Sequence, residues 1–119
     1  MALSDLSEEE RAVVSECLRA SVTGPFFPMW EFHTLFGLEH QEVADIAFRS
    51  SPLDDTSEEV RLAINNALNN LTGYPHRCGS EVWGQYISMP PDAVRAILKK
   101  WKGTSSREPF VDDYFKEMM

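Results

Sequence analysis

The chain has 119 residues, a formal net charge of −8 and two cysteines, Cys17 and Cys78. This length fits a single hydrophobic core and excludes a catalytic domain joined to a regulatory one. The excess of carboxylates opposes binding to nucleic acid or to anionic lipid and favours a protein partner with a basic surface. No apolar run is long enough for a membrane span, and the acidic first residues do not resemble a secretory signal. We therefore expect a cytoplasmic protein with reduced thiols.

The first half of the chain predicts three helices. Ser7 and Glu10 have the spacing of a capping box, in which each side chain accepts the backbone amide of the other. Pro28 suits the first turn of a second helix, because that turn needs no amide donor. Leu38 and Val43 have the spacing of a hydrophobic staple at the start of a third helix. The expected helices cover residues 7–22, 29–36 and 38–48.

The second half predicts three further helices and a tail. Thr56 and Glu59 repeat the capping-box spacing ahead of an apolar stripe with helical period. Three lysines followed by Gly103 are typical of a helix C-terminus. The expected helices cover residues 56–71, 80–87 and 90–102. Beyond them, residues 104–119 are expected to form a linker and a tail helix that packs back on the core or binds elsewhere.

The fold expected from these segments is all-α. No segment alternates apolar and polar residues for the length of a strand, and β-branched residues are sparse. We predict a single compact multi-helix bundle of about six helices with a C-terminal tail helix. The helical domain is expected to cover residues 1–103, and the linker and tail segment residues 104–119.

An aromatic segment at residues 25–36 admits two interpretations. Large rings bury much apolar area, so the segment is expected to lie at the centre of the core. Alternatively, it lines a ligand pocket of an enzyme or a ligand-binding domain. The candidate pocket residues are Trp30, Glu31, Phe32 and His33.

Asparagine is unusually frequent in the helix predicted for residues 56–71. Asparagines at positions 65, 66, 69 and 70 surround Leu62, on the side opposite the apolar stripe. One interpretation is a contact spot for a partner, with Leu62 at its centre. The other is that a further helix, such as the tail, covers this face and that the amides satisfy buried backbone groups. The candidate partner-binding residues are Leu62, Asn65, Asn66 and Asn69.

Catalytic and metal-binding motifs are missing from the sequence. There is no Gly-x-Ser-x-Gly elbow and no glycine-rich phosphate loop. His76 and Cys78 are the closest pair of metal-binding residue types, but they lack the spacing of a zinc motif. We expect no metal site and no cofactor.

The sequence favours one function and leaves two alternatives open. We predict a small acidic cytosolic protein–protein interaction domain, such as an adaptor or an inhibitor, whose partner has a basic surface. A small enzyme or ligand-binding domain that uses the aromatic segment is one alternative. The other is a helix-turn-helix regulator, because residues 41–47 followed by a further helix resemble part of that motif. The acidic start of the second helix opposes DNA binding.

Overall fold

The computed structural model describes residues 3–49, 53, 55–74, 76 and 78–103, and within them the chain is helical without strands. The prediction of an all-α bundle is confirmed. The predicted tail helix in residues 104–119 lies outside the described residues, so the boundary at residue 103 stays a prediction. A short 3₁₀-helix, η1 (Leu3–Asp5), precedes six α-helices. These are α1 (Glu8–Thr23), α2 (Met29–Phe36), α3 (His40–Ala47), α4 (Glu58–Gly73), α5 (Ser80–Tyr86) and α6 (Pro91–Lys102).

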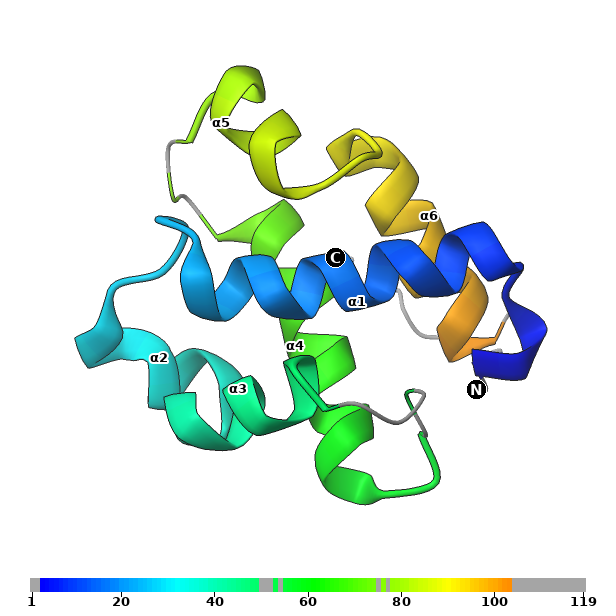
Figure 1. Ribbon diagram of the computed structural model, residues 1–119, viewed down its shortest axis with the longest axis horizontal. Coiled ribbons are helices and arrows are strands. Elements are labelled where there is room, and N and C mark those ends of the chain that lie inside the picture. Colours follow the sequence, from blue (N-terminus) through cyan, green and yellow to red (C-terminus); the bar gives the residue numbers. More distant parts are fainter. Residues whose placement is uncertain (1–2, 50–52, 54, 75, 77, 104–119) are drawn as a thin grey trace, which may run out of the picture.

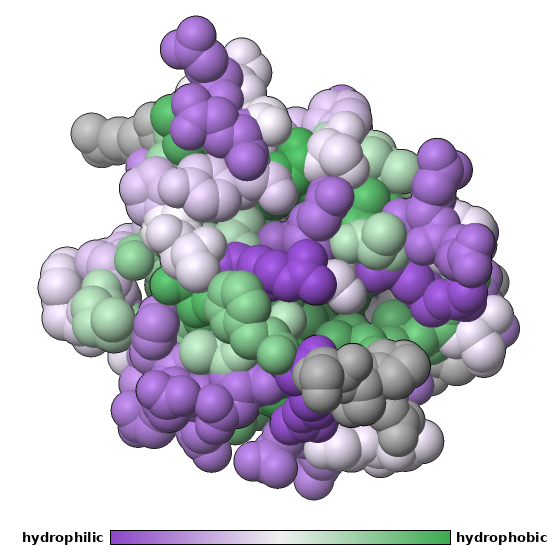
Figure 2. All heavy atoms as spheres, viewed as in Figure 1, coloured by the Kyte–Doolittle hydropathy of each residue, from purple (hydrophilic) through white to green (hydrophobic). Residues whose placement is uncertain are grey.

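Helices α1 and α4 cross at the centre of the molecule (Figure 1). Helix α4 packs against α1, α2 and α6, while α1 also contacts α3 and α5. On the face shown in Figure 2, apolar side chains gather in the middle, on both sides of α1, and hydrophilic side chains surround them. The core draws side chains from every helix. Its largest fully buried members include Phe26, Phe32, Phe36, Leu18, Ile64, Leu68, Leu71, Ile87 and Trp101.

The capping box at the start of α1 is present as predicted. The Ser7 Oγ accepts the Glu10 amide at 3.1 Å, and the Ser7 amide donates to Glu10 Oε1 at 2.8 Å. The same Glu10 oxygen accepts Lys100 Nζ at 2.9 Å, which joins the start of α1 to α6. The hydrogen bond from the Ser7 backbone, followed by that from Lys100, lowers the pKa of Glu10. A local capping signal therefore also serves a long-range contact.

Two predicted helix starts need correction. The capping box predicted for Thr56 is wrong, because α4 begins at Glu58 and its N-cap residue is Ser57, which makes no side-chain cap bond. Arg61 reaches back from α4 instead, and its Nη1 donates to the carbonyls of Asp55 and Thr56 at 2.9 and 3.0 Å. These bonds hold the loop ahead of α4, whose N-cap residue lies one position later than predicted. The third helix likewise begins later than predicted, at His40.

Asp55 joins three distant parts of the fold. Its Oδ2 accepts the backbone amide of Leu3 at 2.7 Å and the indole Nε1 of Trp101 at 3.0 Å. Both donors belong to buried residues, so the carboxylate satisfies groups that would otherwise lose their hydrogen bonds to water. As a result, η1 lies beside the end of α6 (Figure 1). Nothing in the local sequence marked Asp55 for this role.

Candidate functional site

Helix α2 covers part of the asparagine-rich side of α4. The Asn66 Nδ2 donates to the carbonyl of Phe36 at 2.7 Å, and the Asn70 Nδ2 donates to that of Leu35 at 2.9 Å. These carbonyls belong to the last turn of α2, where the backbone carbonyls have no amide donors within their own helix. The amides of α4 therefore complete the end of α2. For Asn66 and Asn70, a neighbouring helix does cover the face, and that helix is α2.

The other predicted partner-binding residues lie in the strip of α4 between α2 and α6. Leu62 is 39% exposed and, with Asn65, lines a shallow hollow that also includes Trp101. Asn69 is exposed further along the same strip and faces α6. The structure thus brings Leu62, Asn65 and Asn69 onto one side of α4, while Asn66 lies against α2.

Three phenylalanines of the aromatic segment lie in the core. The rings of Phe32 and Phe36 stack at a centroid distance of 4.3 Å and an interplanar angle of 1°. The Phe26 ring makes edge contacts with Trp83 and Tyr86 of α5, at 6.0 and 5.7 Å. All three phenylalanines are buried. The core interpretation of the segment is therefore correct for these rings.

The structure does not bring the four candidate pocket residues together. Phe32 points into the core, whereas Trp30 is 81% exposed. Glu31 accepts a hydrogen bond from the Tyr74 hydroxyl, and His33 lies on the exposed side of α2. The hydrogen bond to Glu31, followed by partial burial, raises the pKa of Tyr74. The residues diverge because successive helix positions turn by about 100°, so four neighbours cannot share one side.

An apolar spot remains on the exposed side of α2. Met29 and Trp30 are 65% and 81% exposed, and His33 lies on the same side at helical spacing. We call Met29, Trp30 and His33 the Trp30 face. His33 Nε2 is 3.5 Å from a carboxylate oxygen of Glu39, in the turn that follows α2. Residues 25–48 contain no lysine or arginine. Their acidic residues are Glu31, Glu39, Glu42 and Asp45.

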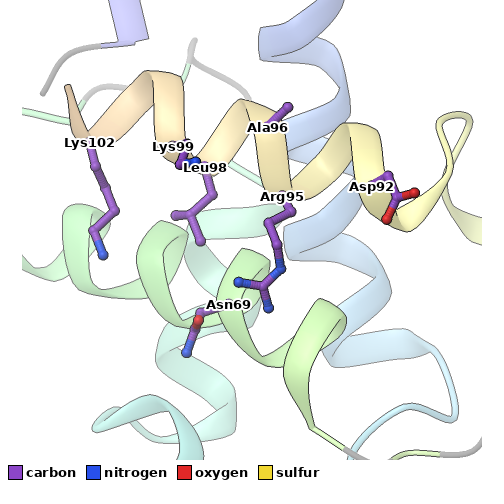
Figure 3. Close-up of a pocket in the computed structure, with 7 residues that line it drawn as sticks. All are labelled: Asn69, Asp92, Arg95, Ala96, Leu98, Lys99 and Lys102. Carbon is purple, nitrogen blue, oxygen red and sulfur yellow. The ribbon is translucent and has the colours of Figure 1, made fainter. Parts of the chain in front are cut away.

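A basic groove runs between α4 and α6, with a volume of about 490 Å³. Arg95, Lys99 and Lys102 follow one another along α6, and in Figure 3 the side chains of Arg95 and Lys102 extend towards α4. The Arg95 guanidinium reaches the last turn of α4, where a Cβ built on Gly73 would lie 3.5 Å from its Nη2. This concentration of cations contrasts with the charge of −8 of the whole chain. The groove is lined by Asn69, Asp92, Arg95, Ala96, Leu98, Lys99 and Lys102.

His76 and Cys78 adjoin one another but do not form a catalytic or metal-binding pair. The Cys78 amide donates to His76 Nδ1 at 3.0 Å, and His76 Nε2 lies 3.0 Å from the Leu71 carbonyl. An amide can only donate and a carbonyl can only accept, so Nε2 carries the proton. Both ring nitrogens are thus engaged by the backbone and neither faces the thiol as a base. The other thiol, Cys17, is buried, and burial raises its pKa.

The helix-turn-helix alternative, which stays a prediction, assigns the role of recognition helix to α4. This helix would have to enter the major groove of DNA. In the structure, α1, α2 and α6 pack around it, and its apolar side lies in the core. The side of α4 that stays open carries Leu62, Asn65 and Asn69 and lies between α2 and α6.

Comparisons with family models, curated proteins and solved structures give no match to this chain. Among the described residues, no helix combines the length and the apolar character needed to cross a membrane. The same part of the chain contains no group of three or more histidine, cysteine or acidic side chains arranged to hold a metal ion. The chemistry of the described surface is therefore what points to a function.

Proposed function

We propose that this chain is a small acidic interaction domain, an adaptor or an inhibitor, that binds a protein partner through the Trp30 face. The exposure of Trp30 carries the proposal. Of the three tryptophans, Trp83 and Trp101 are 5% and 1% exposed, whereas Trp30 is 81% exposed. Tryptophan is the residue type most enriched at the energetic centres of protein interfaces, and methionine, which adjoins it here, is also enriched at interfaces.

The charge around the Trp30 face favours a basic partner. Glu39 lies 3.5 Å from His33 of the Trp30 face, and helices α2 and α3 carry three further carboxylates and no lysine or arginine. An apolar centre with a charged rim is the usual composition of a protein interface. The complementary surface is an apolar pocket with lysine or arginine at its rim, and opposite charges would speed association at low salt. Two free thiols are compatible with action in the reducing cytoplasm.

The proposal is tested by differential affinity capture with three full-length baits: the wild type, Trp30→Ala and Leu62→Ala. Leu62 is the matched control, because it is a partly exposed apolar residue at the centre of the competing α4 strip. We expect a basic protein to be captured by the wild type and by Leu62→Ala. With that protein purified, Trp30→Ala should weaken binding at least about tenfold, or roughly 1.4 kcal/mol.

Folding and salt controls complete the test. Because the Trp30 side chain is mostly exposed, its replacement should change the free energy of unfolding by no more than about 0.5 kcal/mol. Association should slow as salt is raised. If Leu62→Ala abolishes capture and Trp30→Ala does not, the contact lies on the α4 strip. Capture that neither substitution changes would exclude both surfaces as the binding site.

A further inference from the structure

We propose that the basic groove between α4 and α6 binds residues 104–119 of the same chain. The groove opens where the described chain ends. Lys102 lines the groove, and Gly103 follows it directly. Gly103 has a φ of 89°, in a region that favours glycine, and this residue ends α6 by turning the chain away from the helix axis. A segment that leaves at this point starts at one end of the groove.

The cations of the groove lack acidic partners in the described part of the chain. Lys100, on another side of α6, forms an ion pair with Glu10 at 2.9 Å. The structure shows no such pair for Arg95, Lys99 or Lys102 among the residues it describes. The lining has three cations against the one carboxylate of Asp92, so an acidic occupant would offset an excess of positive charge.

The sequence of residues 104–119 complements the groove. It carries four acidic residues against Arg107 and Lys116. If the segment were helical, one of its sides would combine two aromatic residues with two acids. The aromatic residues would contact Leu98 of the groove, and the acids would pair with its cations. That side consists of Phe110, Asp113, Tyr114 and Glu117.

The segment is also long enough to follow the groove. From Asp92 to Lys102, α6 spans about 15 Å at roughly 1.5 Å per residue. Residues 104–119 exceed this length even if they are fully helical. A groove of about 490 Å³ has room for aromatic side chains of the segment. Because the segment is covalently attached at the mouth of the groove, it competes at a high effective concentration with any acidic peptide from elsewhere.

Hydrogen exchange of the full-length chain, measured by mass spectrometry, tests the proposal. Backbone amides in residues 104–119 should exchange at least about tenfold more slowly than in a synthetic peptide of the same sequence. The double substitution Lys99→Glu with Lys102→Glu should remove this protection. Arg19→Glu, a reversal of an exposed charge on α1, is the matched control and should preserve it. Adding Asp112→Lys with Asp113→Lys to the double variant should restore protection.

Three results would overturn the proposal. The first is exchange in residues 104–119 as fast as in the free peptide. The second is protection that survives either the Lys99→Glu, Lys102→Glu reversal or about 1 M salt, which screens charges beyond about 3 Å. The salt measurement uses the wild type, so it remains decisive if the double variant fails to fold. The third is protection that disappears on dilution, because this would place the segment of a second copy in the groove.

Discussion

Replacing Asp55 by alanine should destabilise the domain by more than the loss of one hydrogen bond, because its carboxylate serves two donors. The Asp55 Oδ2 accepts hydrogen bonds from the Leu3 amide at 2.7 Å and the Trp101 indole at 3.0 Å. In Asp55→Ala both donors lose their acceptor while their residues stay buried. A buried donor without a partner costs about 1–3 kcal/mol, so the two together predict a loss of about 2–6 kcal/mol. That is a large share of the roughly 5–15 kcal/mol that stabilises a typical domain.

Asp55→Asn separates the hydrogen bonds from the charge. The amide oxygen can still accept a hydrogen bond from the Trp101 indole. The free energy of unfolding should therefore fall less than in Asp55→Ala, by about 1–2 kcal/mol. Trp101→Phe in the wild-type and Asp55→Ala backgrounds completes a double-mutant cycle. The cycle should give a coupling energy of about 1–2 kcal/mol between the indole and the carboxylate.

Urea unfolding followed by circular dichroism provides the measurement. In Asp55→Ala the urea concentration at the midpoint of unfolding should fall, while the slope of the unfolding free energy against urea concentration stays unchanged. Asp45→Ala is the control, because Asp45 is exposed and, among the described residues, its side chain bonds only to the nearby Gln41 side chain, at 2.8 Å. It should change the free energy of unfolding by less than about 0.5 kcal/mol. If Asp55→Ala is no more destabilising than Asp45→Ala, the reasoning about the two buried donors is wrong.

Three further predictions follow from single contacts. Asn66→Ala should lower the free energy of unfolding by about 1–2 kcal/mol in urea, because the end of α2 loses a donor, and an unchanged midpoint would contradict this role. The raised pKa of Tyr74 means that the hydroxyl's contribution to stability is complete below its unfolded pKa and is lost as the pH rises through the folded value. Glu31→Ala should return the Tyr74 midpoint, followed by NMR, towards its ordinary value, and an unmoved midpoint would assign the shift to burial. In native protein a thiol reagent should modify Cys78 well before Cys17, with both reacting in denaturant, since burial excludes the reagent from Cys17 and raises its pKa. Equal rates in the native state would exclude a stable core around Cys17.

Apolar periodicity in the sequence was sufficient to predict the helices, but long-range hydrogen bonds determine where some of them begin. The start of α4 illustrates this point. Thr56 and Ser57 both offer a hydroxyl near acidic residues, so the local sequence allows a cap at either position. The choice depends on Arg61, which donates to the loop from α4, and on Asp55 within the loop, which connects it to Leu3 and Trp101. The 3₁₀-helix at Leu3–Asp5 was not predicted for the same reason.

The candidate site was harder to predict than the fold. The position of the asparagines relative to the apolar stripe of α4 follows from helical geometry, but the sequence gives no indication that α2 lies against Asn66 and Asn70. Treating the aromatic segment as one unit concealed that Phe32 and Trp30 face opposite environments. The spacing of Phe32 and Phe36, which places both on the core side, was a signal that Trp30 would face outwards.

Because η1 lies beside the end of α6, the order of the helices along the chain could be changed by circular permutation. Contacts through Asp55 hold the first and last described elements next to each other (Figure 1). A short connection between these elements could therefore close the backbone into a ring. The ring could then be cut at the exposed turn containing Gly37, between α2 and α3. Such a circular permutant would start at α3 and finish at α2 while keeping every helix in its present place.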